Sequence, residues 1–124
     1  MSARRFPADE LEALGRAKIV GVRAGSEHRY TGVWVVVVDR RVFVRSWNDK
    51  PTGWYRAFLA EPLGTVQVGH REIPVRAARP RAAELRRAVT QGYAEKYDPK
   101  GAKQWVDGFR EEERERNTLE LLPR

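Results

Sequence analysis

One stretch in the middle of the sequence gathers residue types that bind anions. Residues 45–55 combine arginine, lysine, hydroxyl and amide side chains with two tryptophans. The local pattern predicts that a strand ends here, a polar loop follows and a helix begins. A helix N-terminus carries unpaired backbone N–H groups and about half a positive charge, so it attracts phosphate. The side chains that could join it as donors are Arg45, Ser46, Lys50 and Thr52.

Each tryptophan of this stretch has two possible roles. Trp47 and Trp54 could offer aromatic faces to a flat ring. Large aromatic side chains beside a sheet also pack into a core. The sequence alone leaves both roles open.

A hairpin and a helix are expected to position the stretch. A tight turn over residues 39–41 leads into a strand over 42–47, which becomes polar at its far end. After the loop, Thr52 is expected to cap a helix that ends before Pro62. The residues of this helix that share one apolar face are Trp54, Tyr55, Phe58 and Leu59.

Upstream, the pattern predicts a helix followed by two strands. Pro7 and the acidic residues after it favour a first helical turn, and Gly15 is expected to end that helix. Alternating residues predict a strand over 18–24. Residues 30–38 are mostly β-branched and aromatic, which predicts a strand buried on both faces at the centre of the sheet.

Downstream, a second hairpin and further helices are expected. The hairpin spans residues 65–77 and turns at 69–70, where a glycine suits a primed turn. A helical apolar stripe predicts the longest helix over 80–97, a shorter helix around 105–109 and a closing strand over 118–122. The whole order predicts an α+β protein, an antiparallel barrel-like sheet covered by helices.

Composition limits the classes of protein. The 124 residues suit a single domain spanning 1–124, and 41% hydrophobic with 33% charged residues is a globular composition. No apolar stretch approaches the roughly 20 residues that cross a bilayer, so we expect a cytoplasmic protein. The net charge of +7 suits an anionic partner, which could be nucleic acid, a phosphate-bearing cofactor or an acidic metabolite. A solvated surface rich in arginine explains the same charge.

Several catalytic classes lack their residues. There is no cysteine, which removes thiolate chemistry and cysteine zinc sites. His28 and His70 are the only histidines and do not have metal-ligand spacing, so no metal is expected. Neither a Gly-x-Ser-x-Gly elbow nor a phosphate-binding P-loop is present.

Part of the sequence resembles the deazaflavin-dependent nitroreductases. Their pattern is Trp-Tyr, a helix ending in leucine, proline, and then a Thr-Val-Gln-Val-Gly hairpin. Residues 53–69 and 73–77 follow this pattern, with Trp54-Tyr55 at its start. The resemblance implies an antiparallel split β-barrel of the flavin-binding split-barrel type with flanking helices.

A wider resemblance covers nearly the whole chain. Its residues include Phe6-Pro7, 34–39, 44–46, Trp54-Tyr55 and Tyr93 with Lys96-Tyr97. This pattern is similar to an uncharacterised bacterial family, domain of unknown function 2255. That family brings no established activity.

The split-barrel resemblance also implies a cofactor site. In these relatives the strand end and the loop before the Trp-Tyr helix contact the cofactor phosphate, which matches Ser46 and Asn48. The nitroreductases have a basic Arg-Lys-Ser-Gly loop before their central strand, and residues 23–29 are a loose counterpart. The complete set of candidate cofactor-binding residues is Arg45, Ser46, Trp47, Asn48, Lys50, Thr52 and Trp54.

The implied cofactor is FMN or a deazaflavin, and the implied reaction is a redox reaction. Such a reaction needs few catalytic side chains, because the cofactor carries the hydride. No catalytic residue is therefore assigned. Tyr30, Thr31 and Tyr55 could face a substrate, or their hydroxyls could bond locally. The resemblance also implies a homodimer.

Two other functions stay open. The chain could be a split barrel that has lost its cofactor and serves as an interaction module. It could also bind nucleic acid through a basic face on the second hairpin and the longest helix. The arginines of that face are Arg71, Arg76, Arg79, Arg81, Arg86 and Arg87.

Overall fold

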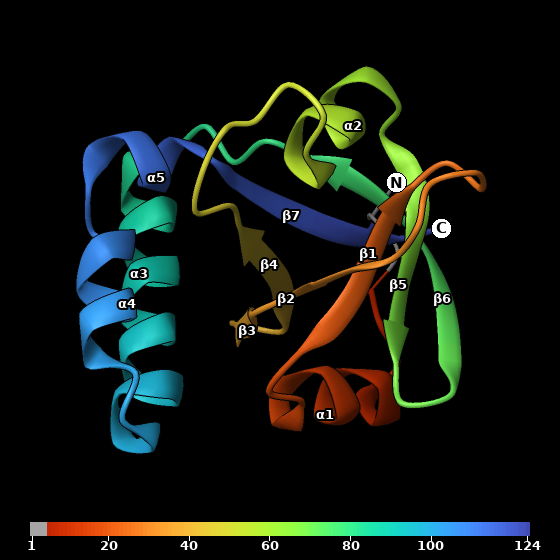
Figure 1. Cartoon of the computed structure of the whole chain (residues 1–124). Helices are drawn as coiled ribbons and strands as arrows, with labels where there is room; N and C mark the ends of the chain where they lie inside the picture. Colours follow the sequence, from red (N-terminus) through yellow and green to blue (C-terminus); the bar gives the residue numbers. More distant parts are fainter. Residues whose placement is uncertain (1–4) are drawn as a thin grey trace.

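The protein is an antiparallel barrel with helices around it, as the sequence predicts (Figure 1). The structure is a computed structural model that describes residues 5–124, and of residue 100 the backbone alone. Residues 1–4, which the predicted domain includes, lie outside the described residues. The expected α+β class is confirmed.

In the described part of the chain, seven strands form one sheet in the order β2-β1-β5-β6-β7-β4-β3, and every neighbouring pair is antiparallel. The two predicted hairpins are present as β3-β4 and β5-β6. The strands are β1 (Val20–Ala24), β2 (Thr31–Val33), β3 (Val35–Val38), β4 (Arg41–Arg45), β5 (Leu63–Val68), β6 (Arg71–Ala78) and β7 (Thr118–Pro123).

The segment predicted as one central strand is instead divided between the two edges of the sheet. Strands β2 and β3 are separated only by Trp34, yet they stand at opposite ends of the strand order. The chain therefore passes from one edge to the other and nearly closes the barrel. The predicted burial is confirmed, because Val33, Val35 and Val36 are buried. The predicted position at the centre of the sheet is wrong. A continuous apolar run indicates burial, but it does not say which strands will pair with it.

Both hairpins turn through left-handed backbone. Asp39 and Arg40 have φ values of 51° and 62°, and Gly69 has a φ of 59°. Two consecutive residues with positive φ are characteristic of a type I′ turn, which matches the twist of the strands it joins. The turn at Asp39 and Arg40 sets the register of β4 and hence the place where the candidate loop begins.

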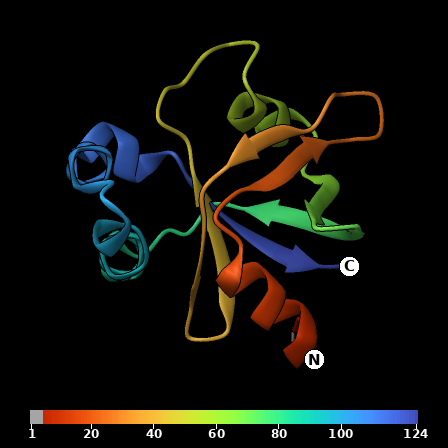
Figure 2. The same ribbon diagram turned by 60° about the horizontal axis from the view of Figure 1, so that its bottom comes forward.

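The helices lie in two regions (Figures 1 and 2). Helices α3, α4 and α5 stand side by side on one flank of the barrel, beyond β3 and β4, whereas α1 and α2 lie at other parts of its surface. Within the described residues, no helix is long and apolar enough to cross a membrane. The helices are α1 (Ala8–Arg16), α2 (Trp54–Ala60), α3 (Ala83–Tyr97), α4 (Lys103–Phe109) and α5 (Glu112–Arg116), with a 3-10 turn at Asp98–Lys100.

Two hydrophobic cores result from this arrangement. The barrel core contains residues such as Val42 and Val44. The second core, between the barrel and α3-α4, contains Phe43 and Val36. Strand β4 thus points alternate residues into different cores, because successive side chains of a strand face opposite sides. By this alternation Arg45 faces the helices, which decides its role.

Candidate functional site

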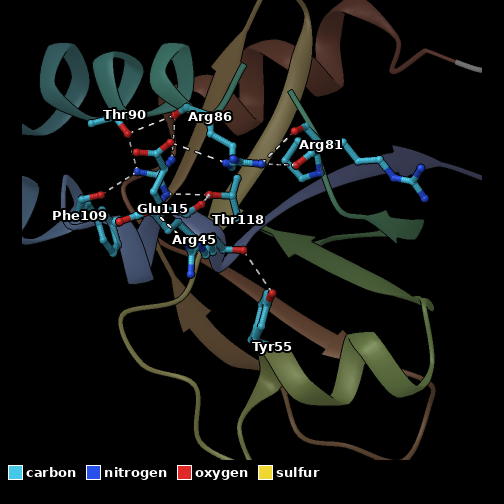
Figure 3. Close-up of polar contacts among 11 residues, drawn as sticks. Arg45, Tyr55, Arg81, Arg86, Thr90, Phe109, Glu115 and Thr118 are labelled. Carbon is cyan, nitrogen blue, oxygen red and sulfur yellow. Dashed lines mark hydrogen bonds and ion pairs between the residues drawn. The ribbon is translucent and has the colours of Figure 1, made fainter. Parts of the chain in front are cut away.

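Arg45, the first predicted phosphate ligand, is buried under the helices with an exposed fraction of 2% (Figure 3). Its Nε donates to Thr118 Oγ1 at 2.8 Å, and Nη1 donates to Thr90 Oγ1 at 2.6 Å and to the Phe109 carbonyl at 2.9 Å. Its Nη2 donates to the Arg86 carbonyl at 2.9 Å. All three nitrogens are thus bonded within the protein, and Arg45 joins β4 to α3, α4 and β7.

Ser46 and Trp47 also contribute to local structure. Ser46 is 5% exposed; its hydroxyl donates to the Asn48 carbonyl, and its backbone N–H donates to the Asn117 carbonyl at 2.9 Å. Trp47 packs against the second core, and the Arg114 guanidinium lies 3.6 Å from its ring centroid. Of the two roles open to Trp47, the structure shows packing.

The loop after Trp47 places its remaining candidate residues on the surface. Asn48, Lys50 and Thr52 are exposed. Thr52 does not cap α2, contrary to the prediction: Gly53 is the N-cap, and no side chain bonds there. The loop instead closes through the Gly53 N–H, which donates to the Lys50 carbonyl at 2.9 Å. This turn places the cap one residue later than the sequence pattern suggests.

Thr52 and Trp54 line a hollow of about 190 Å³, called here the Arg23 hollow. Its other wall comes from β1, the loop after it and the start of β2. Three groups of that wall carry or can carry positive charge, and a threonine adds a hydroxyl. These wall residues are Arg23, His28, Arg29 and Thr31.

The charges of the Arg23 hollow are poorly matched by acids. Neither Arg23 nor Arg29 forms an ion pair with any described residue. The Arg23 guanidinium lies 4.5 Å from the centroid of the Tyr30 ring, and its Nε is buried without a hydrogen-bond partner in the described part of the chain. A buried donor without a partner is costly, so a ligand that accepts from it would be favoured.

The Tyr30 ring packs against the Arg23 guanidinium. The Tyr30 hydroxyl donates to Glu72 Oε1 at 2.7 Å. Burial, and secondly this hydrogen bond, raise the pKa of Tyr30, although the nearby Arg23 charge acts in the opposite direction. The ring thus stays neutral at physiological pH and offers its face to the guanidinium.

The sequence pattern predicted only the side of this hollow that leads into α2. It named Thr52 and Trp54, but not Arg23, His28, Arg29 or Thr31 as cofactor ligands. The basic segment 23–29 is the signal that could have identified the missed residues. It is the loose counterpart of the basic loop of the nitroreductases. Only the fold shows that this segment lies beside the start of α2.

One known protein family matches most of the chain. Residues 10–121 match a family described as "uncharacterized protein conserved in bacteria (DUF2255)". The chain belongs to the DUF2255 family. A comparison with curated protein sequences finds no match.

Solved structures similar to this DUF2255 protein share its fold at low sequence identity. An FAD-binding protein from Mesorhizobium loti is 14% identical with a TM-score of 0.58, and the alignment covers 100% of this chain and 94% of that one. A conserved hypothetical protein from Mycobacterium tuberculosis is 13% identical with a TM-score of 0.61, covering 98% and 83%. The fold of the DUF2255 chain is therefore the predicted split β-barrel with flanking helices.

The basic face predicted for nucleic acid is partly neutralised in the DUF2255 structure. Arg71 pairs with Asp9 at 2.9 Å, and Arg86 lies 3.6 Å from Glu115. The arginines of that face that stay exposed without an ion pair to a described residue are Arg76, Arg79, Arg81 and Arg87.

Proposed function

We propose that this DUF2255 protein binds a phosphate-bearing flavin or deazaflavin and supports a redox reaction with it. The observation that carries the proposal is the Arg23 hollow, where Arg23 and Arg29 converge with Thr31 and Thr52 from separate parts of the chain. Cations and hydroxyl donors in one recess are the groups that hold phosphate.

The hollow fits the phosphate and not the whole cofactor. At about 190 Å³ it is smaller than the roughly 300 Å³ at which pockets for complete ligands begin. The flavin ring would therefore lie outside it, next to the half-buried Trp54. The buried Arg23 Nε supplies the fit: its N–H has no acceptor among the described residues, and a phosphate oxygen would provide one.

One protein of similar fold supports the cofactor class. The Mesorhizobium loti protein, whose name describes it as FAD-binding, aligns over the whole of this chain. At 14% identity this likeness concerns the fold, so the choice of cofactor rests on the residues of the hollow. Those residues recognise a phosphate, which FMN, FAD and the deazaflavin cofactor all carry.

The guanidinium and hydroxyl side chains of the hollow would make different contacts with the phosphate. The Arg23 and Arg29 guanidinium groups would neutralise the phosphate, and Thr31 and Thr52 would donate hydroxyl hydrogen bonds to it. Since α2 has only seven residues, the side chains and not the helix dipole supply most of the attraction. A bound flavin would supply hydride transfer, which needs no acid or base from the protein at this position.

Arg45, Ser46 and Trp47 have a supporting role in this proposal. They fix the end of β4 and so hold the loop that leads to Thr52. Asn48 and Lys50 are exposed on that loop and stay proposed ligands. Substituting each of them by alanine and measuring FMN affinity will separate contact residues from bystanders.

Titration of the purified protein with FMN, FAD and the deazaflavin cofactor tests the proposal. Tryptophan fluorescence should be quenched with saturation by at least one of them, because Trp54 lines the hollow. Arg29→Gln should weaken that affinity about tenfold, the cost of one charge-assisted hydrogen bond. Arg76→Gln is the matched control, since Arg76 is exposed on β6 away from the hollow.

Two outcomes would contradict the proposal. One is the absence of saturable binding of all three cofactors at high micromolar concentration. The other is equal weakening by Arg29→Gln and Arg76→Gln, which would mean that only net charge matters. In the first case, salt-sensitive binding of a DNA or RNA oligonucleotide would support the nucleic-acid alternative instead.

A further inference from the structure

A second hollow lies on the other side of α2 and is called here the Arg79 hollow. It has a volume of about 320 Å³. Tyr55, Arg56 and Leu59 line it, whereas Trp54 and Ala57 of the same helix line the Arg23 hollow. Helix α2 thus separates two cationic recesses.

Arginines from three elements meet in the Arg79 hollow. Arg56 comes from α2, Arg79 from the link between β6 and α3, and Arg116 from the end of α5. Two of them already have acidic partners. Arg56 binds Asp49 through two nitrogens at 2.6 and 2.5 Å, and Arg116 binds Glu112 at 2.7 Å.

Arg79 differs from the other two because it has no ion pair with any described residue. It is exposed and also borders a neighbouring recess with Arg81. Its planar guanidinium presents a fork of N–H donors that matches a carboxylate or a phosphate. Arg79 lies within hydrogen-bonding reach of the Tyr55 hydroxyl, and no acid among the described residues is paired with it.

The Tyr55 hydroxyl provides a second donor beside Arg79. The ring is buried, with an exposed fraction of 3%, and its hydroxyl donates to the Arg116 carbonyl at 3.3 Å, a long hydrogen bond (Figure 3). Burial raises the pKa of Tyr55, and the nearby Arg79 acts to lower it. The hydroxyl keeps its proton at neutral pH and could turn it from the carbonyl to a better acceptor.

Two acids, Asp49 and Glu113, also line the hollow. Asp49 is neutralised by Arg56, whereas Glu113 forms no ion pair with a described residue. With Glu112, the partner of Arg116, counted as well, three arginines face three acids, and Arg79 and Glu113 are the two charges without an ion pair to a described residue. An anion bound at Arg79 would therefore be repelled by Glu113, which lines the same hollow.

We propose that the Arg79 hollow binds a small organic oxyanion, a carboxylate or a phosphate ester, through the Arg79 guanidinium and the Tyr55 hydroxyl. The volume of about 320 Å³ accepts a small organic molecule, and Leu59 offers an apolar contact for its body. This site is independent of the cofactor proposal, because Arg23 and Arg29 lie in the other hollow.

Calorimetric titration with benzoate and with phenyl phosphate tests the site and distinguishes the two anions. Saturable binding of at least one is expected, and the tighter one identifies the anion. Arg79→Gln should weaken it about tenfold and Tyr55→Phe about threefold. Glu113→Gln should strengthen binding, because it removes a like charge. The exposed Arg76→Gln is again the matched control and should leave the affinity unchanged.

Amide NMR shifts locate the bound probe. Asn117, which lines the Arg79 hollow, should shift on titration with either probe, whereas Thr31, which lines the Arg23 hollow, should not shift with benzoate. Arg29→Gln should bind benzoate as the wild type does and should keep the Asn117 shift with phenyl phosphate, so this proposal and the cofactor proposal fail separately. No saturable binding, equal effects of Arg79→Gln and Arg76→Gln, or shifts confined to the Thr31 side would each overturn it.

Discussion

Among single residues, Arg45 is a predicted ligand whose contacts in the structure are all within the protein. A buried cation is costly unless its hydrogen-bond donors are satisfied. Here four neutral oxygens accept from it, and the carbonyl acceptors belong to Arg86 and Phe109. Burial lowers the pKa of Arg45, but the guanidinium keeps its charge at physiological pH.

Replacing Arg45 by alanine should therefore destabilise the protein. The change leaves buried oxygens of Thr90, Phe109 and Arg86 without this donor and creates a cavity, so we expect a loss of about 3 kcal/mol in the free energy of unfolding. Urea unfolding of Arg45→Ala beside the exposed Arg76→Ala measures it. A loss for Arg45→Ala no larger than that for Arg76→Ala would show that the network contributes little.

Sequence could not reveal this role of Arg45. An arginine at the polar end of a strand normally lies in water, and its side-chain partners Thr90 and Thr118 are 45 and 73 positions away. The Arg23 hollow could not be predicted for the same reason, because it joins residues near 23–31 with residues near 52–57, which are distant in the sequence. Thr52 and Trp54 were identifiable because the strand-loop-helix pattern around them is local.

At the scale of elements, Gly108 of α4 shows how closely the helical layer packs. A Cβ at position 108 would collide with the six-membered ring of Trp47. Since Trp47 is also fixed by Arg114, it has little room to move. Gly15 in α1 is different, because a Cβ there would meet only Val37 Cγ2 at 3.7 Å, an ordinary contact.

Two alanine substitutions should thus have opposite effects on stability. Alanine normally stabilises a helix by up to about 1 kcal/mol relative to glycine, and Gly15→Ala should gain part of this. Gly108→Ala should lose stability, because the collision outweighs the helix propensity. Thermal unfolding compares the two variants. If Gly108→Ala unfolded at a higher temperature than the wild type, the packing of Trp47 on α4 would be wrong.

Elements with local signals were predictable, and those defined by distant pairing were not. The turn at Asp39-Arg40 and the glycine at 69 marked both hairpins, and the apolar stripe marked α3. The division at Trp34 had no local signal. It results from closure of the barrel, in which β2 pairs with β1 and β3 pairs with β4. Such pairings depend on the whole sheet and not on one segment's periodicity.

The tyrosines give a prediction at the scale of the whole molecule. Burial raises the pKa of Tyr97 to about 12 and also raises the pKa values of Tyr93, Tyr30 and Tyr55 above the ordinary value of 10. Above pH 10 the unfolded chain therefore binds fewer protons than the folded one. The tyrosine contribution to stability is constant below that pH and falls as the pH rises from 10 to 12.

Alkaline titration measures this effect. The near-ultraviolet absorbance of phenolate should develop at higher pH in the folded protein than in urea. The urea concentration at the unfolding midpoint should decline above about pH 10. Coincident phenolate curves for the folded and unfolded protein would contradict the burial of these rings.

Comparing the affinities for FMN and riboflavin isolates the contribution of the phosphate to binding. The two molecules differ only in that phosphate, so the difference in their affinities reports what the Arg23 hollow contributes. We predict that the wild-type protein binds FMN at least about tenfold more tightly than riboflavin, and that Arg29→Gln removes most of this preference. Equal affinity of the wild type for the two molecules, or a preference that survives in Arg29→Gln, would contradict the assignment of the Arg23 hollow as the phosphate site.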